Sequence, residues 1–172
     1  MRVKVIRVVM RRVWVVVMGL ALLAGCAQQD LVLPQDDDIV EAFQSERPLS
    51  GELVGTVAVL YVEQSSQQLR RGGSLWAKVG PYVFLFSEET RGLLEAYPGL
   101  AGVKVETRVG DAMVASALLS RGELSDLLWR RSLNIAGQAR RDGTNRMTLL
   151  EDLVRWGEDH TVFEYNERYT RR

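Results

Sequence analysis

Hydrophobic and polar residues follow one another in blocks that predict strands in the first half of the chain and mainly helices in the second. Residues 52–63 are almost uniformly apolar and rich in β-branched side chains, which is typical of a strand buried on both faces. Residues 102–109 alternate between apolar and charged positions instead. This alternation predicts a half-buried strand whose solvent-facing side carries Lys104, Glu106 and Arg108.

A second pair of strands is predicted between these two segments. Residues 64–73 are polar and predict a loop. Residues 74–79 and 82–87 are rich in apolar and aromatic side chains and flank a Gly-Pro pair, Gly80 and Pro81, which is a turn signal. We therefore expect a hairpin of two strands here.

Helix-capping residues and 3.6-residue periodicity predict the helices. The expected helices cover residues 87–97, 112–119, 120–141 and 147–157. Ser87 and Asp111 are the expected caps of the first two. Ser120 and Thr148 each precede a glutamate by three residues, which is the capping-box spacing, and Gly157 is expected to end the last helix.

The remaining segments complete the expected fold. Residues 161–165 predict a last strand at a sheet edge, and residues 167–172 form a polar tail. Strands clustered early and helices late predict an α+β fold. We expect a small, mostly antiparallel sheet of about 4–5 strands packed against C-terminal helices, within a single domain over residues 52–166.

The start of the chain has the layout of a secretory signal. Residues 1–12 carry five basic and no acidic residues, and residues 13–23 are apolar. The apolar run is shorter than the roughly 20 residues that cross a bilayer. A single-pass anchor beginning near Val8 is the alternative, but Arg11 and Arg12 interrupt that longer run.

The residues Leu23, Ala24, Gly25 and Cys26 resemble the lipobox of bacterial lipoproteins. The resemblance implies a diacylglycerol on the Cys26 thiol, cleavage just before Cys26, and an amino terminus open to acylation. It therefore implies a signal peptide over residues 1–25 and attachment to the cell envelope through lipid. Ala27 is not the aspartate associated with inner-membrane retention, which favours the outer membrane in a host with two membranes.

Cysteine content agrees with this interpretation. Cys26 is the only cysteine, so the chain can form no internal disulfide and no zinc site built from cysteines. A lone thiol in a secreted protein needs an explanation, and lipidation supplies one. Two or more acyl chains give stable membrane attachment, whereas one binds only reversibly.

Residues 26–51 are expected to be the lipidated amino terminus followed by a flexible tether, because proline and polar residues dominate them. A short helix is expected near residues 38–43. The acidic run Asp36, Asp37 and Asp38 suggests a Ca²⁺ site, but no glycine-and-glutamate loop spacing follows it. A solvated acidic run is the favoured interpretation.

Charge narrows the class of partner. The chain has 22 basic and 22 acidic residues, and without the five cations of the leader 17 basic residues remain, a formal charge of −5. Nucleic-acid binders present clustered basic surface, so no nucleic-acid partner is expected. The same balance argues against electrostatic adhesion to anionic lipid.

Two groups of residues suggest a binding or catalytic site. Trp76, Phe84 and Phe86 are candidates for a ligand-stacking surface, although core or cross-strand packing is the favoured interpretation.

The second group contains His160, the only histidine, which follows Glu158 and Asp159. Three consecutive side chains seldom converge on one ion, so we expect a surface or capping histidine. No catalytic residue, metal site or cofactor is predicted.

These observations favour a non-catalytic interaction or assembly module, anchored by lipid on Cys26 and binding an envelope protein. One alternative is a lipid- or glycan-binding lipoprotein with an apolar groove near the three aromatic candidates. Another is an envelope hydrolase whose catalytic residues are scattered along the chain. A concave apolar pocket would favour the first alternative, and titratable groups converging in a cleft would favour the second.

Overall fold

A computed structural model describes residues 31–43 and 49–171 of the protein. Its five strands form one sheet in chain order. They are β1 (Leu49–Val54), β2 (Val57–Glu63), β3 (Gly102–Val109), β4 (Ala112–Ser120) and β5 (Val162–Tyr165). The described helices are α2 (Asp36–Ala42), α3 (Ser66–Leu85), α4 (Glu88–Ala96), α5 (Asp126–Asp142), α6 (Met147–His160) and α7 (Glu167–Thr170).

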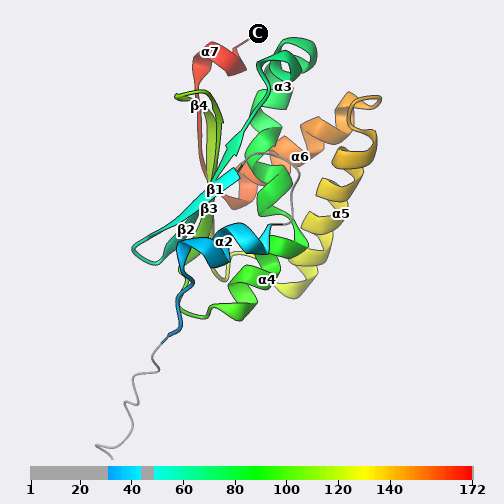
Figure 1. Ribbon diagram of the computed structural model, residues 1–172. Helices are drawn as coiled ribbons and strands as arrows, with labels where there is room; N and C mark the ends of the chain where they lie inside the picture. The colour runs from blue at the N-terminus through cyan, green and yellow to red at the C-terminus, as the bar shows by residue number, and fades with distance from the viewer. Residues whose placement is uncertain (1–30, 44–48, 172) are drawn as a thin grey trace, which may run out of the picture. The chain divides into compact units, whose positions relative to one another are not determined.

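The sheet is mixed but mostly antiparallel. Only β2 and β3 run parallel, and α3 and α4 form the crossover between them. The described helices lie on one side of the sheet: α3 packs on the strands, and α6 and α5 pack beyond it (Figure 1). The expected α+β fold, with a small, mostly antiparallel sheet and helices towards the C-terminus, is confirmed, although the helix that packs most extensively on the sheet is α3, from the middle of the chain.

The apolar segment 52–63 is two strands and not one. Residues of β1 pair antiparallel with β2, from Val54 opposite Val57 to Leu49 opposite Val62. Gly55 makes the turn between them with a φ of 63°, a left-handed conformation that glycine adopts without strain. A continuous apolar run hid this turn, because only one glycine marks it.

The predicted loop over 64–73 and hairpin over 74–87 are wrong, because this region is the helix α3. Ser65 caps the helix by accepting from the Gln67 amide at 3.2 Å. The helix is kinked at Gly73, which has a φ of 65°, and it continues through Pro81. Most of its second half is buried, so apolar side chains occur all round and no helical period is visible in the sequence.

The helix predicted over 112–119 is also wrong, since these residues form β4. Residues 114–117 are all buried, so a strand covered on both faces has the same unbroken apolar pattern as a buried helix. The next helix, α5, begins at Asp126 and not at the Ser120 capping box. Its cap is Ser125, whose hydroxyl accepts from the Leu128 amide at 3.4 Å.

Three predictions with clear local signals are confirmed. Helix α4 is capped by Ser87, which accepts from the Thr90 amide at 3.2 Å. Strand β3 buries Val103, Val105 and Thr107 on one face, as the alternation predicted. Strand β5 lies at the edge of the sheet, where it pairs with β4 alone.

Part of the segment assigned to a tether belongs to the folded body. Residues 36–42 form α2, whose Ile39 is fully buried and approaches Gly51 of β1. Asp36 of α2 accepts from the Leu53 amide at 2.7 Å. The short helix expected near residues 38–43 is therefore present, although it begins two residues earlier.

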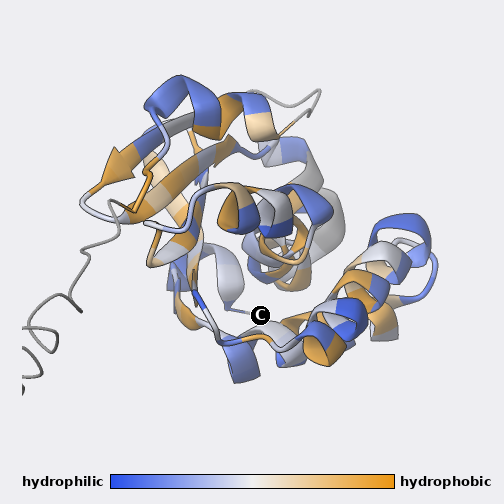
Figure 2. Cartoon of the chain, turned by 90° about the horizontal axis from the view of Figure 1, so that it is seen from below, coloured by the Kyte–Doolittle hydropathy of each residue, from blue (hydrophilic) through white to orange (hydrophobic). Residues whose placement is uncertain are grey.

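The core lies between the sheet and the helices. In Figure 2, hydrophobic residues, coloured orange, occur on both layers where they meet. Tyr82 of α3 and Gly157 of α6 make one of its closest contacts. A Cβ at position 157 would lie 2.3 Å from a Tyr82 ring carbon. Gly157 leaves room for the tyrosine ring. The prediction that it ends the helix is wrong, because α6 continues to His160.

Candidate functional site

The face of the sheet opposite the helices carries a band of polar side chains. Side chains alternate along a strand, and paired residues share a face. The register pairs Tyr61 of β2 with Glu106 of β3, and Glu63 with Arg108. These four residues therefore lie on the face that the described helices leave open.

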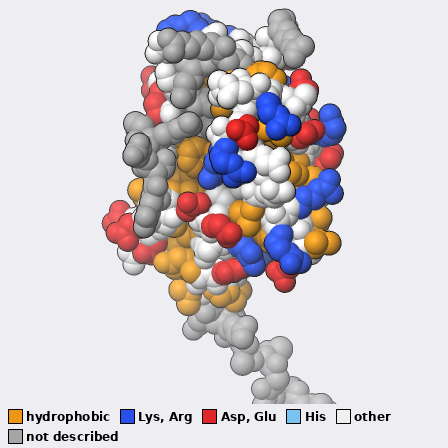
Figure 3. Space-filling view, turned by 90° about the vertical axis from the view of Figure 1, so that its right-hand side faces the viewer, with side chains coloured by type: hydrophobic (Ala, Val, Ile, Leu, Met, Phe, Trp, Pro, Cys, Tyr) orange, Lys and Arg blue, Asp and Glu red, His pale blue; other side chains and the backbone are white. Residues whose placement is uncertain are grey.

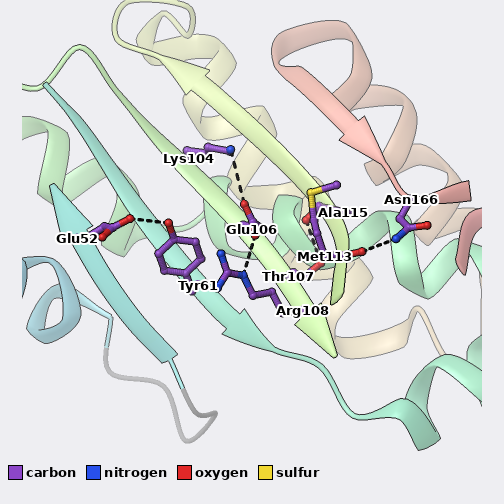
Figure 4. A network of polar contacts seen from close by, with 9 residues as sticks. All are labelled: Glu52, Tyr61, Lys104, Glu106, Thr107, Arg108, Met113, Ala115 and Asn166. Carbon is purple, nitrogen blue, oxygen red and sulfur yellow. Dashed lines mark hydrogen bonds and ion pairs between the residues drawn. The ribbon is translucent and has the colours of Figure 1, made fainter. Parts of the chain in front are cut away.

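Figure 4 shows how these side chains join across the strands. The Tyr61 hydroxyl donates to Glu52 Oε1 at 2.6 Å, and the Arg108 guanidinium carbon lies 4.0 Å from the centre of the Tyr61 ring. Arg108 Nε donates to Glu106 Oε1 at 2.7 Å, and Lys104 Nζ lies 3.7 Å from Glu106 Oε2. The predicted shared face of Lys104, Glu106 and Arg108 is confirmed, and this chain of contacts is the sheet-face network.

The sheet-face network has an ordered charge distribution. Glu106 is its most buried carboxylate, with 13% of its side chain exposed, and it contacts both cations. The hydrogen bond from the Tyr61 hydroxyl to Glu52, together with burial, raises the pKa of Tyr61. The hydrogen bond to Glu106 raises the pKa of Arg108. Tyr61 is thus held as a neutral donor and Arg108 as a cation, and neither is poised for proton transfer near neutral pH.

A shallow groove of about 310 Å³ lies at one end of this network. Its lining comes from β1, β2, the end of β3 and the β3–β4 turn and consists of Leu49, Ser50, Tyr61, Val62, Glu63, Arg108 and Gly110. Glu63 Oε1 accepts from the Gly110 amide at 2.9 Å, which fixes the turn against β2. The groove is open to solvent and has both polar and apolar walls, so it suits a side chain of a partner better than an enclosed ligand.

A second polar cluster lies between α3, α6 and β5. The Tyr82 and Tyr165 hydroxyls are 2.5 Å apart, and Lys78 Nζ lies 5.0 Å from the centre of the Tyr165 ring. Glu158 lies 3.9 Å from Lys78 Nζ. Burial raises the pKa of Tyr82 to about 12 and also raises that of Tyr165. Both tyrosines are held protonated, which suits a structural contact and does not suit a general base.

The structure separates the side chains of Glu158, Asp159 and His160. Glu158 contacts Lys78, Asp159 is exposed, and the His160 ring lies 4.2 Å from the Trp156 ring. His160 Nδ1 is 3.6 Å from Glu123 Oε1, beyond hydrogen-bond distance. Within residues 31–43 and 49–171, no three His, Cys, Asp or Glu side chains are grouped as a metal site would require.

The aromatic candidates all lie on α3 or at its end, outside the groove. Phe84 and Phe86 are buried in the core, where Phe84 packs 6.5 Å from Phe43 and Phe86 stacks 6.1 Å from Tyr82. Trp76 is half-buried and packs against the same core. Core packing, the favoured interpretation, therefore describes Phe84 and Phe86.

The acidic run at residues 36–38 supports the start of α2. Asp38 Oδ2 accepts from the Gln35 amide at 2.8 Å, and Asp36 accepts from the amide of Leu53. Carboxylates in the first turn also suit the positive end of the helix dipole. These roles explain two of the three aspartates without a bound cation.

The leader and the lipobox, including Cys26, lie outside the residues that the structure describes. Where the chain is described, no helix combines the length and apolar character needed to cross a bilayer.

Sequence reasoning did not find Tyr61 or Glu52 as part of a site. Both lie within an apolar segment whose pattern predicts one strand buried on both faces, so the pattern does not indicate that they lie on the open face. The single glycine at position 55 was the available signal for the turn that separates them.

Comparison of the chain with protein-family models, curated proteins and solved structures finds no match. The functional argument therefore depends on the leader and on the geometry of the open sheet face.

Proposed function

We propose that the protein is a lipid-anchored envelope protein that binds another protein through the open face of its sheet, without catalysis. The observation that carries the proposal is the stacking of Arg108 on Tyr61, with Glu52 and Glu106 holding each partner in place. Tyrosine and arginine are enriched in the energetic centres of protein interfaces. Their order in the free protein reduces the entropy lost on binding.

The shape of the surface supports a protein partner. The groove beside Arg108 is shallow and lies on a sheet face, where a partner would contact both the groove and the polar band along β3. Lys104, Glu106 and Arg108 alternate in charge along the strand, so the partner surface is expected to carry charges of both signs.

The lipid anchor is supported by the basic and apolar leader and by the residues before Cys26. Mass analysis of the mature protein tests it directly. We expect a chain that begins at Cys26 and carries a diacylglycerol on the thiol, and we expect Cys26→Ser to remain unprocessed. A mature chain with a free thiol at position 26, or with the leader intact, would overturn the anchor.

Site-specific photocrosslinking in the envelope tests the binding face. A crosslinking residue at Ser50, in the groove, should give one discrete protein adduct, and Arg108→Ala in the same chain should abolish that adduct. The matched control is a crosslinking residue at Arg155 on α6, whose side chain is 74% exposed. The same adduct from both positions, or an adduct from Ser50 that survives Arg108→Ala, would overturn the proposed face.

A further inference from the structure

One end of the domain exposes several large hydrophobic side chains together. Leu31, Val32 and Leu33 are 54%, 60% and 37% exposed, and Val54, beside the β1–β2 turn, is 55% exposed. Figure 2 looks onto this end of the molecule, where these segments have hydrophobic colour, and Figure 3 shows hydrophobic side chains at the lower end of the face in view. We call these four residues the apolar end.

Hydrogen bonds hold both segments of the apolar end on the same loop. The Gly99 amide donates to the Val32 carbonyl at 3.1 Å, and the Ala101 amide donates to the Thr56 carbonyl at 2.7 Å. A Cβ at position 99 would lie 2.7 Å from the Leu31 carbonyl oxygen. The segment 31–33 is therefore seated on the folded body, and its side chains are presented by that body.

Arg121 holds the loop over residues 97–101, whose Gly99 contacts the segment 31–33. Its guanidinium donates to the Leu100 carbonyl and, at 2.6 Å, to the Tyr97 carbonyl. The apolar end is thus a built surface with a defined arrangement of Leu31, Leu33 and Val54, and exposed apolar patches of this kind mark interaction surfaces.

The covalent chain places this surface near Cys26. Five Cα–Cα steps separate Cys26 from Leu31, and an extended chain covers at most about 3.6 Å per step, or about 18 Å in all. We propose that the apolar end rests on the phospholipid surface, with Leu31, Leu33 and Val54 inserted at the headgroup level. This inference rests on the proposed lipidation of Cys26.

Nearby charges define the chemistry of that contact. Asp36, Asp37 and Asp38 form the first turn of α2, and Asp36 is bonded to the amide next to Val54. These carboxylates oppose an anionic lipid surface, so the contact depends on apolar insertion and does not require anionic lipid. Vesicles of zwitterionic phosphatidylcholine are therefore the suitable probe.

A fluorescence experiment on the mature, lipidated protein that begins at Cys26 tests the contact. Cys26 is the only cysteine, so once it is acylated Val54→Cys supplies the single free thiol for a dye. Asp111→Cys is the matched control, because the β3–β4 turn lies at the other end of β3, about 25 Å from Gly102. In vesicles with a nitroxide quencher at headgroup depth, we expect loss of dye fluorescence at position 54 and not at position 111.

A second pair of variants separates apolar insertion from general proximity. The double change Leu31→Ser and Leu33→Ser should reduce quenching at position 54 while leaving the protein folded and attached to vesicles. Met147→Ser, a change of an exposed residue at the start of α6, should leave quenching unchanged. Quenching that is insensitive to the leucine changes would overturn the inserted contact.

The outcomes distinguish this inference from the lipid anchor. One dye per chain and flotation with vesicles would support the anchor. If quenching were then equal at positions 54 and 111, the apolar-end contact would be overturned while the anchor stands. Two dyes per chain would show a free Cys26 thiol and would overturn the anchor, and the contact with it.

Discussion

The hydroxyl oxygens of Tyr82 and Tyr165 lie 2.5 Å apart and join α3 to β5, although the two residues are 83 positions apart in sequence. Strand β5 has four residues and pairs with β4 alone. A strand this short gains little from its own ladder, so the tyrosine pair is a principal contact between the sheet edge and the helical layer. Its strength can be measured directly.

Removal of either hydroxyl should weaken the fold. Tyr82→Phe and Tyr165→Phe each delete one hydrogen bond, with an expected loss of about 0.5–1.5 kcal/mol in the free energy of unfolding. Because both variants break the same bond, the double variant should lose less than the sum. Denaturant unfolding measures these values, with Tyr169→Phe as the control for loss of a tyrosine hydroxyl elsewhere. Additive losses would show that the two hydroxyls are not coupled.

Alkaline pH should destabilise the protein through the same pair. Below pH 10 both tyrosines are neutral in the folded and unfolded states, so their contribution to stability is complete. The unfolded tyrosine loses its proton near pH 10, whereas burial holds the pKa of Tyr82 at about 12.

Stability should therefore fall as the pH rises from 10 to 12, by about 1–2 kcal/mol after allowance for the solvent exposure of the pair. Over this range the free energy of unfolding should change less with pH in the double variant, Tyr82→Phe with Tyr165→Phe, than in the unmodified protein. Equal slopes in the two proteins would contradict the assignment of this loss to Tyr82 and Tyr165.

Gly157→Ala should be strongly destabilising. The new methyl group would lie 2.3 Å from a Tyr82 ring carbon in a packed core, and overpacking of this kind costs about 1–3 kcal/mol. Gly92→Ala in α4 is the matched control, because nothing lies within 4 Å of its added Cβ. That change should stabilise the protein by about 0.5–1 kcal/mol through helix propensity. Thermal unfolding of the two variants should shift in opposite directions.

Ser132→Ala should leave a buried donor without an acceptor. Trp156 Nε1 donates to Ser132 Oγ at 2.8 Å, and that hydroxyl donates to the Leu128 carbonyl at 2.9 Å. The serine is fully buried between α5 and α6, so we expect a loss of about 1–3 kcal/mol in the free energy of unfolding. The same change in a Trp156→Phe background should cost less, because no indole N–H is left unpaired. An equal cost in both backgrounds would contradict this role.

Secondary structure could be predicted where local chemistry was distinctive. Helix α4 combines a serine cap with two acidic residues in its first turn, and β3 alternates strictly between apolar and charged residues, so each carries a clear local signal. Most of the second half of helix α3 and residues 114–117 of strand β4 are buried, and burial removes the polar positions from which a period of 3.6 or 2 is recognised. Pro81 has the sequence signature of a turn residue although it lies buried within α3, whereas Gly73 does leave the helical conformation, at the kink of α3.

The candidate site could be predicted only along one strand. The charge pattern of Lys104, Glu106 and Arg108 is local to β3, and their shared face followed from alternation. Tyr61 and Glu52 join them through the pairing of β1, β2 and β3, which depends on a turn at Gly55 and a crossover through two helices. No pattern within a single segment specifies those pairings.

The parallel pairing of β2 with β3 has a consequence for the order of folding. Both hairpins, β1–β2 and β3–β4, close over two-residue turns. The central pair, β2 with β3, is instead joined by the long connection that contains α3 and α4. Closing so long a loop costs chain entropy before the hydrogen bonds between β2 and β3 can form and offset it. We therefore expect the two hairpins to form early and independently. The parallel pairing of β2 with β3, which joins them into one sheet, should be the step that limits the rate of folding.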